Sequence, residues 1–466
     1  MREDVSYRFE PLDRRGVLMG LGPGQLAVLV VALLVAIALA KTWPNPGGFV
    51  AAASALASGG LLCRPVAGRP PPQWLGVAAS FGSRRRVTAE PPPALSPAPA
   101  LRLPARTFAS GVYLCQLPAL NGQPAVGALL DERSGTAAAL LRARGGSFCL
   151  LDEREKDHRL AAWAGVLESV SAQRSSLVRL QWCQRALSGD SRALLAHLRS
   201  SGDPGSPGFE GQVALLERAG QRAWCHETLL VVSVKCRSQR RGGHPTAEGA
   251  ETLRNEVRAL RAQMRSTGFV CEGVLDAAAV ATALGNFVVP GLSQSIGAFP
   301  WPLAIEERWS EVRIEGAWHR TYWVAEWPRS RVGPDFLSPL LVGTARRSFS
   351  VAMAPVPPEK AARETESSRT AHAADAQLRA QGGFLPTARQ RRQSEALEGR
   401  ETELADGRGA FELAGYVTVS AEDKPALEEA AAELERAAGA AKLYLRPLYG
   451  QQKEALTWSL PFGRGV

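Results

Sequence analysis

The beginning of the chain constrains its architecture most, because two uncharged stretches follow one another within the first 63 residues. No charged residue occurs over residues 16–40, and residues 26–40 are an unbroken apolar run. A second uncharged stretch covers residues 42–63. About 20 apolar residues are enough for a helix to cross the roughly 30 Å hydrocarbon core of a bilayer. We therefore predict a transmembrane helical hairpin that anchors the chain through residues 1–68.

Flanking charges predict how this hairpin is oriented. Arginines precede the first stretch and follow the second: Arg2, Arg8, Arg14, Arg15, Arg64, Arg69, Arg84, Arg85 and Arg86. The turn between the stretches contains a single charged residue, Lys41. Lys and Arg accumulate on the cytoplasmic side, so we expect two spans in the cell (inner or plasma) membrane and both termini in the cytoplasm. A signal peptide cleaved near Ala40 is the alternative, although acidic residues before the first stretch argue against it.

The composition of the whole chain is that of a folded protein. Of the 466 residues, 45% are hydrophobic and 21% are charged, which excludes a wholly disordered chain. A net charge of +10 favours an anionic neighbour such as lipid headgroups, nucleic acid or an acidic protein. The seven cysteines form no Cys-x-x-Cys motif, which argues against a zinc ribbon or a disulfide framework and indicates a reducing compartment.

Beyond the apolar region, short β-type runs alternate with helical patterns. Eight runs have the β-branched and aromatic content of strands: residues 111–117, 136–142, 176–182, 228–235, 312–315, 321–327, 348–353 and 415–420. Apolar residues recur at helical spacing in three segments: residues 152–172, 251–266 and 424–442. We therefore predict an α+β fold whose cytoplasmic body is built of split β-α-β pairs.

Changes in composition suggest how this body is divided. Prolines over residues 69–106 predict a stiff, polyproline-like spacer. The parts expected after the spacer are a first α+β domain, a second α+β region, a helical arm and a closing strand-helix-strand segment: residues 107–244, 245–356, 357–409 and 410–466.

Motifs for chemistry are sparse. The chain has no Gly-x-x-x-x-Gly-Lys-Ser/Thr loop, whose fixed glycines and lysine cradle nucleotide phosphates. We expect a non-enzyme with no cofactor, no metal site and no catalytic residues. Cys225, His226 and Glu227 form the densest polar cluster, but adjacent strand residues point to opposite faces. We interpret this cluster as structural, and a hydrolase centred on His226 is the alternative.

Two groups of side chains could form contact surfaces. Four arginines share one stripe of the helix predicted over residues 251–266, and they are Arg254, Arg258, Arg261 and Arg265. They form a possible basic contact face for an acidic partner, with a solvated face as the alternative. The second group consists of four aromatic residues that lie close to one another in the sequence: Trp318, Tyr322, Trp323 and Trp327. Core packing explains this group, with a protein interface as the alternative.

Several segments resemble proteins of one kind of machine. Residues 414–421, 445–452 and 460–465 are similar to the end of the N-terminal region of conjugative type IV secretion ATPases of the TraC/TrbE/CagE group. Tyr-Arg-Phe at residues 7–9, Arg-Arg-Gly at residues 14–16 and the paired spans resemble the small PrgI-type membrane subunit, in its actinobacterial form. The chain ends where the ATPase domain would begin, so the resemblance does not imply ATP hydrolysis.

In that family the segment corresponding to residues 445–465 joins the N-terminal region to the motor, which suggests a docking surface. Its candidate residues are Leu448, Tyr449, Gln451, Gln452, Leu456, Trp458, Leu460 and Phe462. Apolar residues in a chain end can anchor a partner. The alternative is that residues 442–450 add an edge strand and the rest folds back onto the chain's own sheet.

Together these features predict a non-enzymatic, membrane-anchored assembly subunit of a type IV secretion or conjugative DNA-transfer apparatus. Its expected partners are the lipid bilayer, a separately encoded secretion ATPase, other membrane subunits and further copies of itself. A membrane-tethered protein that guides DNA is the alternative, suggested by the positive charge. DNA contact is not favoured, since no aromatic residue lies between the arginines to stack on bases.

Overall fold

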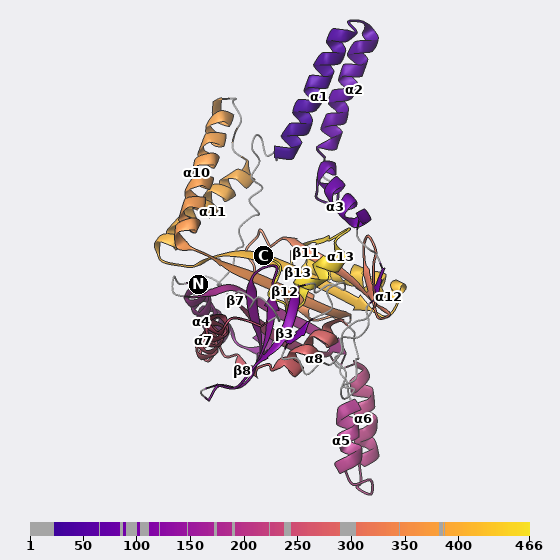
Figure 1. Cartoon of the computed structure of the whole chain (residues 1–466), viewed down its shortest axis with the longest axis vertical. Coiled ribbons are helices and arrows are strands. Elements are labelled where there is room, and N and C mark those ends of the chain that lie inside the picture. The colour runs from indigo at the N-terminus through magenta and orange to yellow at the C-terminus, as the bar shows by residue number, and fades with distance from the viewer. Residues whose placement is uncertain are drawn as a thin grey trace. The chain divides into compact units, whose positions relative to one another are not determined.

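The computed structural model describes most of the chain. The described residues are 23–64, 66–83, 87–89, 100–102, 111–120, 122–146, 148–171, 175–188, 192–222, 224–236, 244–288, 304–343, 345–381, 385 and 387–466. The chain divides into two compact units. One unit contains the β-sheet with residues 86–362 and 402–466, and the other contains residues 9–85 and 363–401. The α+β class predicted from the sequence is confirmed (Figure 1).

All the strands of the described residues belong to one sheet. They are β1 (Val87–Ala89), β2 (Ala100–Arg102), β3 (Val112–Leu117), β4 (Val126–Asp131), β5 (Thr136–Arg144), β6 (Leu177–Ser188), β7 (Trp224–Lys235), β8 (Val270–Val274), β9 (Ala304–Glu307), β10 (Val312–Ile314), β11 (Ala317–Glu326), β12 (Arg346–Val356), β13 (Ala410–Ala421) and β14 (Tyr444–Pro447). The helices of the same unit are η1 (Phe148–Leu150), α4 (Glu153–Ser171), α5 (Arg192–Ser201), α6 (Phe209–Arg222), α7 (Ala247–Met264), α8 (Ala277–Val288), α9 (Ser338–Leu341), α12 (Lys424–Ala440) and α13 (Gln452–Ser459).

The sheet consists of two consecutive repeats with the same strand order. In the first repeat the strands lie side by side as β8-β5-β7-β6, and in the second as β14-β11-β13-β12. In chain order, the strands of the first repeat are β5, β6, β7 and β8, and those of the second are β11, β12, β13 and β14. In each repeat a helix connects the first strand in chain order to the second, and another helix connects the third to the fourth. These helices are α4 and α7 in the first repeat, and α9 and α12 in the second.

The correspondence between the repeats extends beyond these strands. Two antiparallel strands precede each repeat (β3-β4 and β9-β10), and a helix follows it (α8 and α13). Two helices also separate the second strand from the third: α5 and α6 in the first repeat, and α10 (Pro358–Gln381) and α11 (Ala388–Ala405) in the second. The repeats join where the equivalent strands β6 and β12 pair in antiparallel fashion. This junction relates the repeats by an approximate two-fold axis normal to the sheet.

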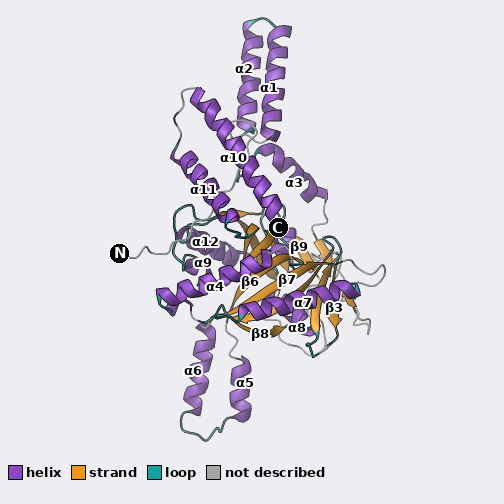
Figure 2. Cartoon of the chain, turned by 90° about the vertical axis from the view of Figure 1, so that its left-hand side faces the viewer, coloured by secondary structure: helices purple, strands orange, loops and turns teal. Residues whose placement is uncertain are grey.

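Helices cover both faces of the sheet. Along β7, Leu230 and Val232 face the side on which α4, α7 and α12 pack, whereas Leu229 and Val231 face the side of α8 and α13. Successive strand residues point to opposite faces, so a strand covered on both sides is apolar without alternation. This explains the continuous apolar run of β5. Figure 2 shows α4 and α7 lying across the strands.

Each of the eight strands predicted from the sequence is present, and so are the three predicted helices. The predicted domain boundary after residue 244 is wrong, because β8 returns past α7 to pair with β5. The separation of residues 410–466 from residues 245–356 is also wrong, since β12 and β13 are paired neighbours, whereas residues 363–401 of the predicted arm do belong to the other unit. Helix α7 is therefore a crossover within the first repeat. The repeats meet in sequence between α8 and β9.

The predicted proline-rich spacer over residues 69–106 is also corrected. Residues 71–83 form helix α3 (Pro71–Ser83), which begins with two prolines. Proline is tolerated in the first helical turn because its missing N–H would have no partner there. Further along, β1 pairs with β9 and β2 pairs with β3, so both are strands of the sheet. Apart from residues 69 and 70, the remainder of this segment lies outside the described residues.

The second unit contains helices. They are α1 (Pro23–Thr42), α2 (Pro46–Leu62), α3, most of α10 (Pro358–Gln381) and all but the end of α11 (Ala388–Ala405). The residues predicted as a helical arm thus form α10 and α11. These two helices are joined by an ion pair of 2.6 Å between Arg369 and Glu401 and by a 2.9 Å hydrogen bond between His372 and Gln393.

Helices α1 and α2 lie against each other in antiparallel orientation (Figure 1). Gln25 Nε2 donates to the Cys63 carbonyl oxygen at 2.8 Å. The helices approach so closely that a Cβ atom at Gly59 would lie 2.5 Å from the Cβ atom of Ala32. Of the described helices, α1 is long and apolar enough to cross a membrane, over Gly24–Thr42. Helix α2 is apolar but shorter, with 17 residues.

Candidate basic groove beside helix α7

Helix α7 presents its arginines next to its buried face. Thr246 caps the helix, because its side chain accepts a hydrogen bond of 3.2 Å from the Gly249 N–H. Leu253, Val257 and Leu260 are buried against the sheet at helical spacing. The arginine stripe is one residue further along at each turn, so it lies at the edge of the covered face.

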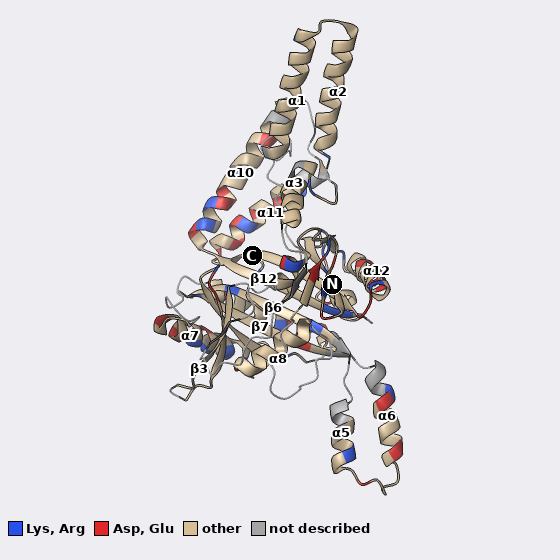
Figure 3. Ribbon diagram, turned by 45° about the vertical axis from the view of Figure 1, so that its right-hand side comes forward, with Lys and Arg blue, Asp and Glu red and all other residues tan. Residues whose placement is uncertain are grey.

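A groove of about 440 Å³ runs beside this stripe. It is lined by residues of α7 and β8, of the segment between them, and of the start of β4 with the segment before it: Gln123, Pro124, Val126, Arg254, Val257, Arg258, Arg261, Ala262, Arg265, Phe269, Val270, Cys271 and Val274. The valines and Phe269 supply apolar surface, and the arginines supply positive charge. Figure 3 shows the basic residues on α7 in blue.

The four arginines have different surroundings. Arg254 is 9% exposed and donates from Nη2 to the Pro118 carbonyl oxygen at 2.6 Å. Its Nε is buried and has no hydrogen-bond partner among the described residues. The Gln123 amide, turned with its oxygen toward Arg258, accepts from Arg258 Nε at 3.2 Å. The guanidinium groups of Arg261 and Arg265 have no hydrogen bond or ion pair within the described residues, so they remain available to a ligand.

The electrostatics of the groove are one-sided. It has four arginines, and no carboxylate belongs to the described residues that line it. That local charge of +4 compares with +10 for the entire chain. Cys271 is half-buried at the floor, and burial raises the pKa of its thiol although Arg261 acts in the opposite direction. A neutral thiol leaves the positive charge of the groove uncompensated. The four arginines predicted to share one stripe therefore lie along one wall of a concave surface.

The predicted docking residues near the C-terminus are mostly part of the protein core. The buried members are Leu448, Gln452, Leu456, Leu460 and Phe462, all at most 5% exposed. A docking role is thus wrong for these five, because their side chains already pack within the sheet unit. The edge-strand alternative is the observed structure, with β14 paired to β11. Tyr449, Gln451 and Trp458 are half-buried, and the Trp458 ring lies 5.4 Å from that of Tyr416.

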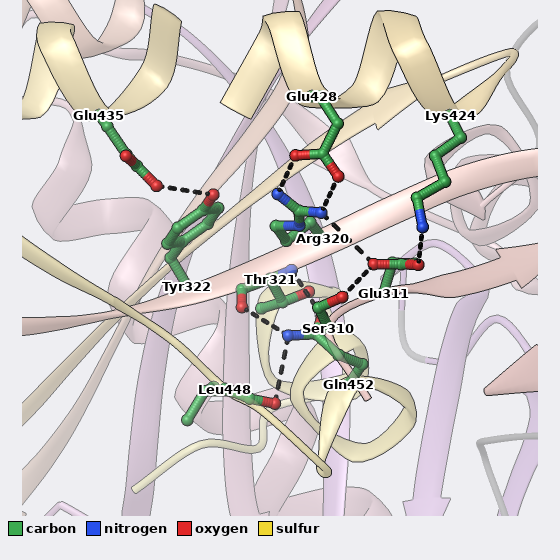
Figure 4. Close-up of polar contacts among 10 residues, drawn as sticks. All are labelled: Ser310, Glu311, Arg320, Thr321, Tyr322, Lys424, Glu428, Glu435, Leu448 and Gln452. Atoms are coloured by element: carbon green, nitrogen blue, oxygen red, sulfur yellow. Dashed lines mark hydrogen bonds and ion pairs between the residues drawn. The ribbon is translucent and has the colours of Figure 1, made fainter. Parts of the chain in front are cut away.

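Gln452 explains why this segment folds back. Its side-chain oxygen accepts from the Thr321 N–H at 2.8 Å, and its Nε2 donates to the Thr321 and Leu448 carbonyl oxygens at 3.2 and 3.1 Å. The buried amide thereby imitates a neighbouring strand where β14 has ended (Figure 4). Its role is to satisfy backbone groups of β11.

An ion-pair network lies close to Gln452 (Figure 4). Glu311 is 2% exposed and accepts from Lys424 at 3.1 Å and from Arg320 at 3.3 Å. Arg320 also donates twice to Glu428, at 2.8 and 2.6 Å. Burial acts to raise the pKa of Glu311, but hydrogen bonds from Ser310 and Lys424 outweigh it and leave this pKa below its usual value. Every charge here has an opposite partner, so the network links β11 and α12 to the residue before β10.

The described side chains of the Cys225-His226-Glu227 cluster are those of His226 and Glu227. Glu227 accepts from Arg185 and, at 3.0 Å, from Arg142. Both carboxylate oxygens of Glu227 are thus ion-paired with guanidinium groups. Burial and the nearby Arg347 lower the pKa of His226. The Cys225 side chain lies outside the described atoms. No group of three metal-ligating side chains occurs in the described part of the chain.

The aromatic group belongs to the core. Trp318 is 9% exposed and Tyr322 is fully buried, while Trp323 and Trp327 are half-buried against the same sheet. The interface alternative is therefore not supported for Trp318 and Tyr322.

No protein-family model matches the chain, and no curated protein matches it.

The sequence pattern identified the arginines but missed the opposite wall of the groove. Gln123 and Pro124 precede β4, and Val270 and Val274 belong to β8, two strands that were not predicted. β8 has five residues, including Gly273, and its pairing partner β5 lies about 130 residues earlier, so no local signal marks it.

Proposed function

We propose that this protein is a non-enzymatic, membrane-anchored assembly subunit of a type IV secretion or conjugative DNA-transfer apparatus. Helices α1 and α2 cross the inner membrane as a hairpin with both termini in the cytoplasm. The sheet unit, read as two split β-α-β repeats, binds protein partners, among them a separately encoded ATPase. The observation that carries the proposal is the combination of an apolar helix and an unneutralised basic groove in a single chain.

The exposed surface of α1 supports the membrane anchor. Val31 and Leu34 are 59% and 60% exposed, and Val30 is 51% exposed. A helix that is apolar on every side needs hydrocarbon or protein around it. In α2, Val50 and Phe49 are 66% and 61% exposed. Tilting or bilayer thinning accommodates a helix of 17 residues in a bilayer.

Cysteine accessibility tests the topology. Trp43 lies between the helices and is 62% exposed, and its replacement leaves the Asn45 cap of α2 intact. In intact cells, Trp43→Cys should react with a membrane-impermeant maleimide, whereas the unchanged chain should not. A C-terminal tag should become accessible only after the cells are lysed. Protection of residue 43 together with labelling of the tag would contradict the orientation.

Purification from cells that produce the whole apparatus tests the assembly role. The full chain should copurify with the ATPase of the apparatus, and the purified chain alone should not hydrolyse ATP. Turnover that follows the protein through successive purification steps would contradict the non-enzyme proposal.

The positive groove also favours a second candidate, a protein that guides DNA. Phosphate contacts are strongly weakened by salt, in proportion to the number of phosphates neutralised. Binding of a duplex oligonucleotide that falls steeply between 50 and 200 mM salt, and that depends on the groove arginines, would favour this candidate over protein docking.

A further inference from the structure

We infer that the groove between α7 and β8 binds an extended, acidic segment of a partner protein, which adds a strand at β8 and pairs its carboxylates with the arginines of α7. The inference deepens the proposed assembly function, on which it rests, by naming the chemistry of the partner.

The second repeat shows which residues stand at the positions equivalent to the arginines of α7. Helix α12 is the equivalent of α7, and their buried positions correspond when Leu253 is matched with Ala430 and Val257 with Leu434. Arg254 and Arg261 then correspond to Ala431 and Ala438, which are both 2% exposed. Alanines allow the helix to pack directly on the sheet. The arginines are therefore not required by the fold of the repeat.

The pairing of β8 supplies the backbone part of the site. Within the described chain β8 pairs with β5 and with no other strand. An edge strand presents N–H and C=O groups that an extended peptide can use. The side chain of Val270 is 64% exposed at this strand. Arg144 forms an ion pair with Glu272, so the one carboxylate of β8 is already neutralised.

The charge of the groove selects the partner. Arg261 and Arg265 are free of protein partners among the described residues, and Arg254 is buried with an unsatisfied Nε. Along the axis of a helix, residue 261 lies about 4.5 Å beyond residue 258, and residue 265 lies about 6 Å beyond residue 261. Alternate residues of a strand are about 6.7 Å apart. Carboxylates on alternate residues of an added strand can thus each reach a different arginine.

Alternation along an added strand decides which of its side chains meet the arginines. Val126, Val257 and Val274 line the groove together with the arginines. A segment that alternates acidic and apolar residues places one kind of side chain on each side of its backbone. Its carboxylates can therefore all face the arginines of α7, while its apolar side chains face the opposite side of the sheet.

A peptide-binding experiment on the full chain in detergent tests this inference. The probe is a rhodamine-labelled octapeptide of alternating Val and Glu, and its binding is followed by fluorescence anisotropy. An alternating Val and Lys octapeptide should not bind. The triple substitution Arg258→Gln, Arg261→Gln, Arg265→Gln should weaken binding of the Val-Glu probe by about 10-fold or more, since charge-assisted hydrogen bonds are lost. Arg254 is retained because it is buried and bonded to Pro118.

Matched controls distinguish binding at the groove from nonspecific attraction to the positive charge of the protein. The control variant removes three exposed arginines that do not line the groove, through Arg154→Gln, Arg218→Gln and Arg331→Gln. It should change the affinity for the Val-Glu probe by less than about 2-fold. Both variants should keep the melting temperature of the unchanged chain. Two further probes are N-methylated at every Val or at every Glu. Hydrogen bonds to β8 use one set of alternate residues, so one of these probes should lose binding and the other should retain it.

Several outcomes would overturn the inference. They are no binding of the Val-Glu probe, equal weakening by both triple variants, or full binding of both N-methylated probes. Tighter, arginine-dependent binding of a 20-nucleotide single-stranded DNA, or of vesicles with phosphatidylglycerol, would assign the groove to DNA or to lipid instead. Because the topology test at residue 43 does not involve the groove, failure here leaves the membrane anchor unaffected.

Discussion

His319 illustrates how burial changes the behaviour of a single polar side chain. It lies on β11 and is fully buried, with its Nδ1 2.8 Å from the Ser420 hydroxyl oxygen. Burial lowers the pKa of His319 to about 4, against a smaller opposite effect of the Val288 backbone. The folded protein therefore holds this imidazole in its neutral form at physiological pH.

This shift predicts a dependence of stability on pH. An unfolded histidine has a pKa of about 6.5, so below that pH the unfolded state binds a proton that the folded state does not. The free energy of unfolding should fall as the pH decreases from 7 to 5, by about 2 kcal/mol from this residue. In His319→Gln that part of the slope should disappear. Urea unfolding of both proteins at pH 7, 6 and 5 measures it, and equal slopes would contradict the prediction.

Gly463 shows the steric limits of one position in the C-terminal segment. Its φ is +68°, and an added Cβ would lie 2.2 Å from the Ser233 Oγ. Gly463→Ala should lower the free energy of unfolding by about 2 kcal/mol or more, because it adds both backbone strain and a clash. Gly439 in α12 has open space around it, so Gly439→Ala is the control and should not destabilise the protein. Similar effects in both variants would contradict this account.

At the scale of elements, the C-terminal segment fastens the two repeats together. Gln181 of β6, in the first repeat, donates to the Leu460 carbonyl oxygen at 3.0 Å and accepts from the Gly463 N–H at 2.8 Å. Arg464 pairs with Asp131 of β4 at 2.7 Å. Helix α13 itself packs against β11, β12 and β13 of the second repeat. The segment thus crosses the β6–β12 junction on one face of the sheet.

Truncation after Gly450 should therefore destabilise the sheet unit. It removes Leu456, Leu460 and Phe462, which are at most 3% exposed. Burial of side chains of this size contributes about 2 kcal/mol each, so the loss should be roughly 5 kcal/mol or more. Thermal unfolding followed by circular dichroism should show a clearly lower melting temperature. An unchanged melting temperature would mean that the segment is a separate docking element after all.

At the scale of the molecule, both repeats place a pair of helices between their second and third strands. In the first repeat, β6 and β7 are paired to the end of the hairpin, where Ser188 is opposite Trp224. Helices α5 and α6 are thus inserted at a hairpin tip, and Arg199 and Glu217 form an ion pair of 3.0 Å between them. The sheet does not depend on this insertion for its strand order.

Removal of the insertion tests this architecture. Replacing residues 189–223 by Asn-Gly, which favours a tight turn between antiparallel strands, should leave the melting temperature within about 3 °C. The truncation after Gly450 is the contrasting control, since it deletes a similar type of helix from the core. Unfolding of the variant without α5 and α6 would show that these helices stabilise the sheet.

The sequence by itself determined those features that depend on neighbouring residues. The apolar run predicted α1, because a helix satisfies its own backbone groups within one segment. Asp423 and Pro425 predicted the start of α12, where the Asp423 side chain accepts from the Ala426 N–H at 2.8 Å. Strand-type composition predicted eight strands, and helical spacing brought the arginines of α7 onto one stripe.

Only the tertiary structure decided which strands are neighbours. β8 pairs with β5, and β6 of one repeat pairs with β12 of the other, across long stretches of chain. The free energy of such pairing depends on side chains that meet only after the chain has folded, so no local pattern specifies it. For that reason the repeats, the burial of Gln452 and the opposite wall of the groove could not be predicted. The arginines were visible in the sequence, but the groove that they line is a property of the fold.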